Sequence, residues 1–374
     1  MRLLDSPLPE RIFSFFRDLV KLESESGCEG KVVSYIKEFC SDLSLECTED
    51  ETGQKTSGNA GNLTIIVPPS NSSNEYIILN AHMDTVTPVR GANLIENEER
   101  FASDGKTILG ADDKAGIAAI LALTENLIRK SIPHKGLEIV LTVQEEPGLI
   151  GVKNYDFSRL RGRWGYVLDG AGDIGGIIIE SPGSEKLKFL IKGRAAHAGV
   201  EPEKGRSSIL CASKAISRLN PGRIDEETTS NIGIIKGGRA TNIVPDETFV
   251  EGEIRSFNEE KLIVQRERFI KTFEEEAEAL GCKAEISVER SFDHFKIQDN
   301  SRALFEIERA MEICEIKPER KRSGGGSDAN VFNKNGFEMV VLDVGIQNAH
   351  SKDEFIFKEH LVLITTIIHA LVKA

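Results

Sequence analysis

The sequence contains few cysteines and no cysteine motif. Only six cysteines occur among its 374 residues, and none of them forms a CxxC pair. They lie within apolar patterns, which indicates buried free thiols rather than a disulfide framework or a zinc-thiolate site. These absences argue against redox chemistry and against a structural metal bound through sulfur.

Long apolar runs and basic stretches are also missing. No segment approaches the roughly 18 uninterrupted apolar residues that a membrane-spanning helix needs, and the first residues lack the apolar core of a signal peptide. Acidic side chains outnumber basic ones by 60 to 47, which gives a formal net charge of -13. No cluster of lysine and arginine with interleaved aromatics offers a surface for nucleic acid. We therefore expect a cytoplasmic protein with neither a nucleic-acid nor a membrane partner.

The spacing of apolar residues changes along the chain. Helical spacing predicts two amphipathic helices at 12–20 and 32–43. Short runs of valine, isoleucine and leucine follow at 63–67, 76–81, 137–143, 165–169 and 339–344, and helical segments alternate with them near 114–130, 299–315 and 357–373. Such runs are typical of strands that are covered on both faces. Their alternation with helices predicts an α/β fold with a mostly parallel sheet flanked by helices.

Residues 184–294 have a different pattern. The order of strands and helices there is βαββαβ, which describes a compact α+β unit in its own right. We interpret this unit as an insertion that divides an α/β domain into residues 1–183 and 295–374. The insertion alternates like an open sheet, and pairing between two copies of the chain would cover its exposed edge. We therefore expect a homodimer formed through the inserted domain.

Acidic and imidazole side chains gather where the apolar runs end. They are His82, Asp84, Asp112, Asp113, Glu145, Glu146, Asp169 and His350. The carboxyl ends of parallel strands share one edge of an open α/β sheet, so these groups can converge in a single crevice. Oxygen ligands mixed with imidazole and without thiolate suit zinc, manganese or cobalt. The pattern favours a metal site.

Each pair alone has an ordinary structural explanation. Glu145 and Glu146 could begin a solvated helix, and Asp112 and Asp113 could cap the helix that follows them. Taken together, these explanations would leave several charged or imidazole groups at buried strand ends with nothing to pair them. A shared site accounts for all of them at once.

These segments resemble the M20 zinc peptidases, and among them the peptidase T-like tripeptide aminopeptidases. The matching motifs are AHMDTV (81–86), GADDKAG (110–116), QEEPGLIG (144–151), LDG (168–170), GRAAHAG (193–199), TNIVP (241–245) and GGGSDAN (324–330). The resemblance extends from about residue 10 to the C-terminus. It implies the zinc exopeptidase type of fold, with the insertion serving as a lid and dimerisation domain.

The resemblance also implies two Zn²⁺ ions per subunit, with Co²⁺ or Mn²⁺ as alternatives. His82 and Asp169 would bind one ion, Glu146 and His350 would bind the other, and Asp112 would bridge both. Two divalent cations would be neutralised by the three carboxylates and a bridging hydroxide, which makes a buried cluster tolerable. The peptide bond that follows the bridging acid is commonly cis in this family.

Two further acids match the catalytic groups of the family. Glu145 matches the general base, which would take a proton from the metal-bound water and later deliver it to the leaving amine. Asp84 lies two residues beyond His82, on the same side of an extended strand, and matches the acid that orients this imidazole.

The insertion and the glycine-rich motif would supply the substrate contacts. By resemblance, His197 would stabilise the oxyanion in the neighbouring subunit, with Asn242 nearby, and Arg255 would bind a substrate carboxylate. The segment that contacts the substrate backbone would include Gly325, Gly326 and Ser327. Ordinary readings exist as well, since His197 could belong to a simple turn and Arg255 could face water.

The resemblance therefore predicts a di-zinc metallopeptidase that hydrolyses the N-terminal peptide bond of short peptides. Asp169 is the main discriminator within the family, because aminopeptidases usually have Asp at this position whereas carboxypeptidases and acylases usually have Glu. An M20-type carboxypeptidase or an N-acyl amino acid amidohydrolase is the alternative. A binding protein without catalysis is a further alternative, although such a protein need not retain Glu145 beside five metal ligands.

Overall fold

The computed structural model describes residues 8–70, 75–89 and 93–373, which form two compact units. The first unit consists of the described residues up to Glu180, Lys296–Ser323 and those from Ser327 onward, and the second consists of Ser181–Phe295 with Gly324–Gly326. Among the described helices, none has both the length and the apolar character that crossing a membrane would require.

The second unit differs slightly from the insertion expected at 184–294. It begins at Ser181 and also includes Gly324–Gly326. Ser181 Oγ donates a hydrogen bond of 2.7 Å to the carbonyl oxygen of the middle glycine, and Arg255 Nη1 donates one of 2.9 Å to that of the first. These bonds attach the glycine segment to the second unit, although its neighbours in the chain belong to the first.

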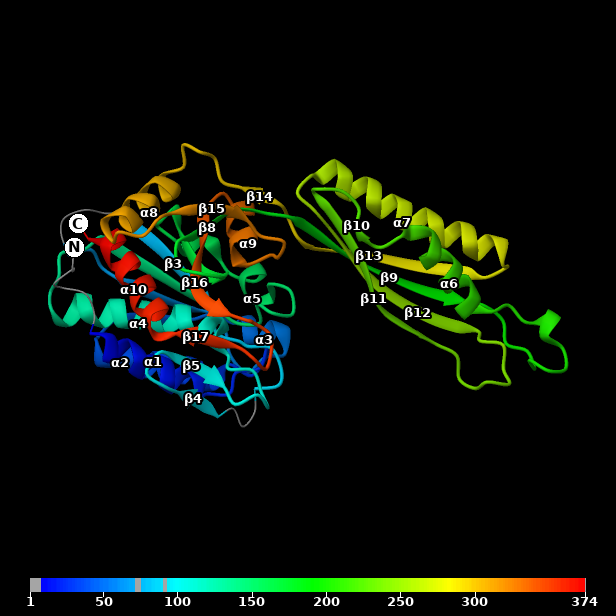
Figure 1. Cartoon of the computed structure of the whole chain (residues 1–374), viewed down its shortest axis with the longest axis horizontal. Helices are drawn as coiled ribbons and strands as arrows, with labels where there is room; N and C mark the ends of the chain where they lie inside the picture. The colour runs from blue at the N-terminus through cyan, green and yellow to red at the C-terminus, as the bar shows by residue number, and fades with distance from the viewer. Residues whose placement is uncertain (1–7, 71–74, 90–92, 374) are drawn as a thin grey trace. The chain divides into compact units, whose positions relative to one another are not determined.

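A mixed sheet forms the centre of the first unit (Figure 1). Its middle strands run parallel, in the spatial order β6, β3, β7 and β16. They span Gly136–Thr142, Tyr76–His82, Trp164–Ala171 and Glu338–Gln347, respectively. Most of their side chains are buried, as expected for apolar runs that are covered on both faces. Their carboxyl ends therefore lie along one edge of the sheet.

Most border strands of this sheet pair antiparallel with their neighbours. They are β1 (Glu46–Glu49), β2 (Leu63–Val67), β4 (Leu94–Glu96), β5 (Arg100–Ser103) and β17 (Phe355–Phe357). The remaining strands are β8 (Gly176–Ser181), β14 (Phe295–Lys296) and β15 (Glu319–Arg322). The predicted α/β fold is confirmed, but the sheet as a whole is mixed rather than mostly parallel. Short strands joined by tight connections, such as β4 and β5, must return antiparallel.

Helices pack against the sheet. They are α1 (Pro9–Val20), α2 (Gly30–Asp42), α3 (Thr52–Thr56), α4 (Ala111–Arg129), α5 (Ile150–Lys153), η1 (Phe157–Arg159), α8 (Arg302–Ile313), α9 (Asp328–Lys334) and α10 (Lys358–Val372). Helix α4 is buried along most of its length because it packs against β3, β7 and β16 as well as against α1 and α10. This packing fixes the turn that precedes α4.

The second unit has the predicted order βαββαβ, with short additional elements. Its elements are β9 (Gly183–Lys192), η2 (Pro202–Lys204), α6 (Ser208–Leu219), β10 (Gly222–Arg223), β11 (Thr228–Gly237), β12 (Glu247–Ser256), α7 (Glu259–Ala279) and β13 (Lys283–Phe292). All strand pairs are antiparallel, in the spatial order β10, β11, β12, β9, β13. Side chains along β12 alternate between buried and more exposed, which indicates one covered face.

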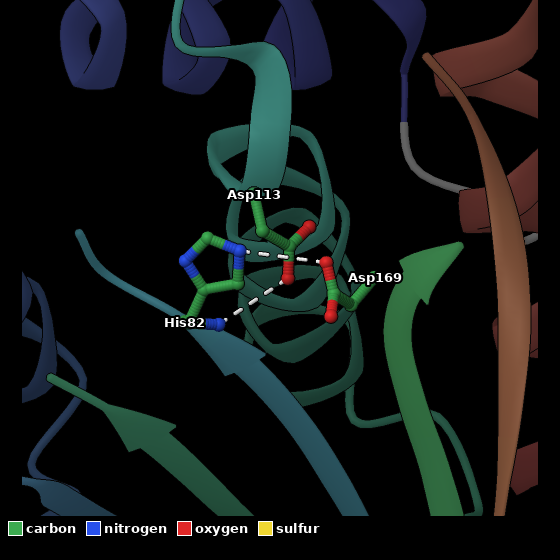
Figure 2. Close-up of side chains that lie close together, drawn as sticks. All are labelled: His82, Asp113 and Asp169. Atoms are coloured by element: carbon green, nitrogen blue, oxygen red, sulfur yellow. Dashed lines mark hydrogen bonds and ion pairs between the residues drawn. The ribbon is translucent and has the colours of Figure 1, made fainter. Parts of the chain in front are cut away.

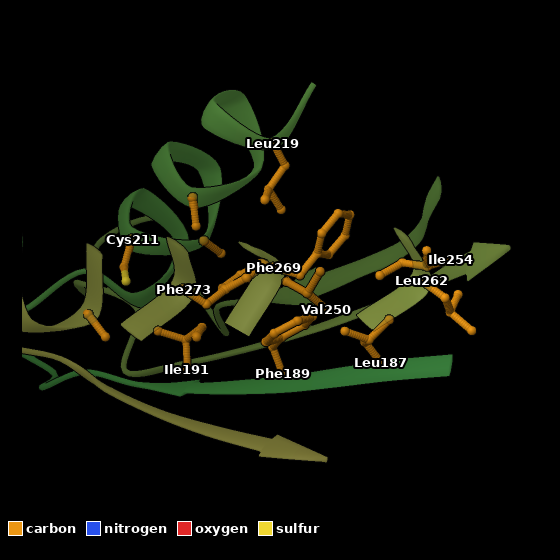
Figure 3. Close-up of a cluster of buried hydrophobic side chains, with 13 residues drawn as sticks. Leu187, Phe189, Ile191, Cys211, Leu219, Val250, Ile254, Leu262, Phe269 and Phe273 are labelled. Carbon is orange, nitrogen blue, oxygen red and sulfur yellow. The ribbon is translucent and has the colours of Figure 1, made fainter. Parts of the chain in front are cut away.

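The buried face of this sheet carries the core of the second unit (Figure 3). Apolar side chains of β9 and β12 meet those of α6 and α7, and Figure 3 shows several of them between α6 and the strands. The rings of Phe189 and Phe273 stack with centroids 3.9 Å apart. The second unit thus has a hydrophobic core of its own, as a separate domain requires.

Candidate metal centre

His82 is the last residue of β3, and its imidazole is almost completely buried. Its Nδ1 lies 3.0 Å from the main-chain oxygen of Asp84 and 3.4 Å from a carboxylate oxygen of the same residue. An N–H at Nδ1 can donate to these oxygens, which leaves the lone pair at Nε2. That Nε2 lies 3.2 Å from Asp112 Oδ1 and 3.4 Å from Asp169 Oδ1. Figure 2 shows the imidazole facing the Asp169 carboxylate.

Asp112 lies between two imidazoles. Its Oδ1 faces His82 Nε2, and its Oδ2 lies 3.1 Å from His350 Nε2. One carboxylate oxygen thus points toward each histidine, which is the arrangement that a bridging ligand needs. The peptide bond between Asp112 and Asp113 is cis, in agreement with the resemblance.

Glu146 and His350 complete the cluster. Glu146 follows β6, and His350 lies in the loop after β16, where its Nε2 is 3.0 Å from Glu146 Oε1. This carboxylate oxygen is buried, and apart from its ion pair with His350 it has no hydrogen-bond partner among the described residues. The structure therefore brings together all five predicted ligands, and each lies at or beyond the carboxyl end of a central strand or at the start of α4.

The electrostatics of the cluster indicate an excess of acid. Burial raises the pKa of Asp169 to about 7, although His82 opposes this shift. Burial would lower the pKa of His82, but its contacts with Asp112 and Asp169 outweigh that effect and raise it. The pKa of His350 rises to about 10 because Asp112 and Glu146 stabilise its imidazolium. The positive charge of the imidazoles offsets the negative charge of the carboxylates only partly. Bound divalent cations would neutralise the remaining negative charge.

The donor atoms fit divalent cations. The ligand atoms of His82, Asp112 and Glu146 lie within 4.8 Å of one another, and the same holds for His82, Asp113 and Asp169. Oxygen and imidazole donors without sulfur suit zinc, cobalt or manganese. The residues present therefore could hold two such ions.

Asp84 connects both sides of the cluster. Besides its contact with His82, it accepts hydrogen bonds from the backbone N–H of Glu145 at 2.8 Å and of Glu146 at 3.2 Å. Ser26 Oγ donates a third bond of 2.6 Å. Asp84 is fully buried, so these bonds are not exchanged with water. The turn that carries Glu145 and Glu146 is held by the same side chain that faces His82.

Glu145 is buried beside the predicted ligands. Burial, followed by repulsion from Asp169, raises the pKa of Glu145 well above its usual range. Two divalent cations nearby would oppose this shift and favour the ionised carboxylate. The environment therefore allows Glu145 to gain and lose a proton, as a general base must.

Asp113 has a place in the site that sequence reasoning did not assign. Its Oδ2 accepts the backbone N–H of His82 at 3.3 Å (Figure 2). Its Oδ1 accepts the backbone N–H of Gly116 at 3.1 Å. The carboxylate thus ties the end of β3 to the first turn of α4. The adjacent acids in the motif GADDKAG were the only signal for it in the sequence.

Asp328 is a second buried acid near the site. It belongs to α9, and its carboxylate accepts hydrogen bonds from Thr142 Oγ1 at 2.5 Å and Asn80 Nδ2 at 3.1 Å. Burial raises its pKa to about 6. Ser327, the preceding residue, caps α9 in a capping box with Asn330. This part of the glycine-rich motif is therefore anchored to β3 and β6.

The predicted substrate residues of the second unit form two groups. His197 forms an isolated bridge with Ile243, and the N–H of Ala198 donates to the carbonyl oxygen of Asn242 at 3.0 Å, so His197 and Asn242 are neighbours on the surface. Arg255 lies at the other end of β12.

Arg255 and the glycine segment form the second group. The guanidinium Nη1 donates to the Gly324 carbonyl oxygen, and Nη2 lies 3.1 Å from Glu253 Oε2. Two of its nitrogens are thus engaged within the second unit, while Nε is buried and has no hydrogen-bond partner in the described part of the chain. Arg255 is therefore not simply facing water.

Two family models match the chain. Residues 179–281 match the model described as "Peptidase dimerisation domain", and residues 62–175 match the model described as "Peptidase family M28". The first match covers most of the second unit. The second contains β3, α4, β6 and β7, which carry most of the clustered acids and His82.

Two curated relatives cover 97% and 69% of the chain. The sequence is 40% identical to the protein YqjE of Bacillus subtilis over 364 aligned residues. The aligned region covers 97% of this chain and 98% of YqjE. It is 28% identical to peptidase T of Escherichia coli, over 69% of this chain and 64% of that protein.

Two solved structures have the same architecture. The aminopeptidase PepT from Bacillus cereus superimposes with a TM-score of 0.87 at 38% identity, covering 98% of this chain and 99% of that one. A tripeptidase from Staphylococcus aureus superimposes with a TM-score of 0.93 at 36% identity, covering 98% of each chain. These structures confirm the predicted α/β fold with its insertion.

Proposed function

Because the chain belongs to the M20 family of metallopeptidases, in its peptidase T-like branch, we propose that it removes the N-terminal residue from tripeptides and similar short peptides. The chain is a peptidase and thus a hydrolase. One observation carries the proposal for the site: Asp112 directs one carboxylate oxygen to His82 and the other to His350. Such a carboxylate is suited to holding two cations side by side.

We propose that these cations are zinc, with cobalt or manganese as substitutes. His82 and Asp169 would hold one ion, Glu146 and His350 the other, and Asp112 would contact both. When bound, the ions would polarise the scissile carbonyl and lower the pKa of the attacking water. The oxygen and nitrogen donors of the cluster support this assignment, as does the burial of Glu146 Oε1 beside His350 Nε2.

Glu145 would act as the general base. Its carboxylate would accept a proton from the attacking water and return it to the amine that leaves. Asp84 would support this step indirectly, because it holds the backbone of Glu145 and orients the imidazole of His82. The buried surroundings would keep other water away from the proton that is being transferred.

The inserted domain would complete the site of a second subunit. His197 and Asn242 precede β12, whereas Arg255 is near its end. A strand of 10 residues is about 33 Å long, at about 3.3 Å per residue. A short peptide that contacts Arg255 through its carboxylate is therefore too small to reach His197 of the same subunit. A homodimer would supply His197 and Asn242 from the partner.

The surface of the second unit supports such a homodimer. Several apolar side chains are exposed there, with exposed fractions between 38% and 50%: Ile209, Leu210, Ile234, Ile235 and Ile243. Within the described residues, β11 pairs on its outer side only with the short β10, at Thr229 and Ser230. Open strand edges and exposed apolar patches are features of protein interfaces.

Replacing Ile235 with glutamate is expected to convert the dimer into monomers. A charge placed on the open edge of β11 would have to be buried in the interface without a partner. Light scattering after size-exclusion chromatography measures the mass, and peptidase assays should show at least about a 100-fold loss of kcat, as for the removal of an oxyanion donor. Val264→Glu, at an exposed position on α7, is the control and should remain dimeric. An active monomeric Ile235→Glu protein would contradict the proposal.

The substrate class is tested with a panel of peptides. We expect tripeptides with a free amino group to be cleaved at the first bond at least about 100-fold faster than the same peptides after N-acetylation. Mass spectrometry of the products identifies the bond that is cut. Preferential turnover of N-acyl amino acids would instead indicate an amidohydrolase, and release of C-terminal residues a carboxypeptidase.

We also propose a cytoplasmic location. All six cysteines are free thiols, and free thiols are typical of proteins in reducing compartments. Localisation of the tagged protein by cell fractionation tests this proposal, and recovery mainly from the medium would contradict it.

A further inference from the structure

Glu354 has a buried side chain that the proposed mechanism does not use. It lies in the first unit, four positions after His350, and only 1% of its surface is exposed. Its carboxylate accepts three backbone hydrogen bonds, two from the residues that precede α4 and one from the second residue of α4. Oε2 accepts the N–H groups of Leu109 and Gly110, both at 2.8 Å, and Oε1 accepts that of Asp112 at 3.1 Å.

Glu354 is itself held firmly in the chain. Its N–H donates to the carbonyl oxygen of Ser351 at 3.2 Å, and its own carbonyl oxygen accepts the N–H of Ser103 in β5 at 3.0 Å. Asn348 closes the loop from the other side, because its Nδ2 donates to the carbonyl oxygen of Asp353 at 3.3 Å. The loop that contains His350 and the carboxylate of Glu354 therefore form one hydrogen-bonded segment.

This segment contacts or contains two of the residues that would hold the second cation, Asp112 and His350. Asp112 and His350 come from distant parts of the sequence, yet Asp112 Oδ2 and His350 Nε2 lie 3.1 Å apart. We propose that Glu354 is a positioning residue of the metal centre, which sets the place of the Asp112 backbone relative to the loop that carries His350. This inference rests on the metal centre of the proposed function and extends it outward from the ligands.

A carboxylate is required for this role. Two oxygens share three N–H donors, and the charge strengthens each of the bonds. A glutamine at this position would keep one acceptor oxygen and turn an NH₂ group toward at least one backbone N–H. The turn around Gly110 and Asp112 would then have to move or leave a buried donor without a partner. The bridging ligand would move with it.

The test is the metal affinity of Glu354→Gln. The protein is freed of metal with a chelator and then titrated with Zn²⁺ in competition with a chromophoric chelator, so no peptide substrate is involved. We expect the affinity for at least the weaker-bound ion to fall about 10- to 100-fold, the range found when groups that orient metal ligands are replaced. Excess Zn²⁺ should restore most of the occupancy, because all five ligands are still present.

Glu138→Gln provides a matched control. Glu138 is also fully buried, and its carboxylate accepts the backbone N–H groups of Arg161 at 2.9 Å and Gly162 at 2.8 Å. It lies near the start of β6, whereas Glu145 and Glu146 follow the end of this strand. Glu138→Gln should lower the urea midpoint much as Glu354→Gln does, but it should bind Zn²⁺ like the wild type.

The outcomes separate this inference from the proposed function. Wild-type affinity in Glu354→Gln, or an equal loss of affinity in both variants, would overturn the role of Glu354. A wild-type chain that binds two ions but cleaves no peptide would overturn the proposed peptidase specificity and leave Glu354 supported. A wild-type chain that takes up no ions would overturn both. If Glu354→Gln does not fold, Glu354→Asp, which keeps the charge on a shorter side chain, must show the reduced affinity instead.

Discussion

Glu145→Gln is expected to lower kcat about 1,000-fold, within the range attributed to general acid–base catalysis, while both metal sites stay occupied. The amide has nearly the volume of the carboxylate, so the buried packing is retained, but it cannot accept a proton at neutral pH. Steady-state kinetics with a tripeptide measure kcat and KM, and elemental analysis of the purified protein measures the metal content. KM should change little, because the side chain acts on the water and not on substrate binding.

Glu138→Gln, which replaces another buried carboxylate, is also the control for Glu145→Gln. Glu138→Gln changes a carboxylate at the opposite end of β6 and should keep kcat within about 10-fold of the wild type. A Glu145→Gln protein with turnover similar to that control would show that another group is the base. Loss of metal in Glu145→Gln would mean instead that Glu145 is a ligand.

Asp112→Ala is expected to remove the metal centre. This carboxylate faces both His82 and His350, so its loss takes one ligand from each cation. Only two ligands then remain for each cation. The metal content should therefore fall from two ions to fewer than one per subunit. Affinity should drop by more than about 100-fold, beyond the effect of replacing an outer group, and peptidase activity should disappear.

Asp353→Ala is the control for this change. Asp353 is an exposed aspartate in the loop that follows His350, and its side chain lies outside the cluster. It should retain two ions and full activity. Zinc affinity and activity close to those of the wild type in Asp112→Ala would contradict a bridging role.

The sequence predicted the centre of the fold because buried parallel strands have a strong signal. The apolar runs at 76–81 and 137–143 correspond closely to β3 and β6. His82 and Asp169 could be assigned to one edge of the sheet because the ends of parallel strands converge there. Apart from β2, whose apolar run at 63–67 was recognised, the border strands gave no such signal. Strands of three or four residues, such as β4, contain too few positions for a period to be recognised.

Contacts made through the backbone could not be predicted. Glu354 stabilises the turn at Asp112 by accepting hydrogen bonds from backbone N–H groups. Because nearly every residue has such a donor, the sequence does not indicate which ones Glu354 binds. The attachment of Gly324–Gly326 to the second unit depends on two hydrogen bonds to carbonyl oxygens and is equally invisible. Asp113 was noticed as part of an acidic pair, but its bond to the His82 N–H depends on the fold.

Asp84 has a consequence for how this sequence can vary. The same carboxylate receives the N–H groups of Glu145 and Glu146 and the hydroxyl of Ser26, while its residue also faces the His82 ring. A change at any of these partners alters the hydrogen bonding of the Asp84 carboxylate, and the other partners bind the same carboxylate. Substitutions in the segment around Ser26 and in the turn after β6 are thus coupled, and tolerated variants should change these distant stretches together rather than one at a time.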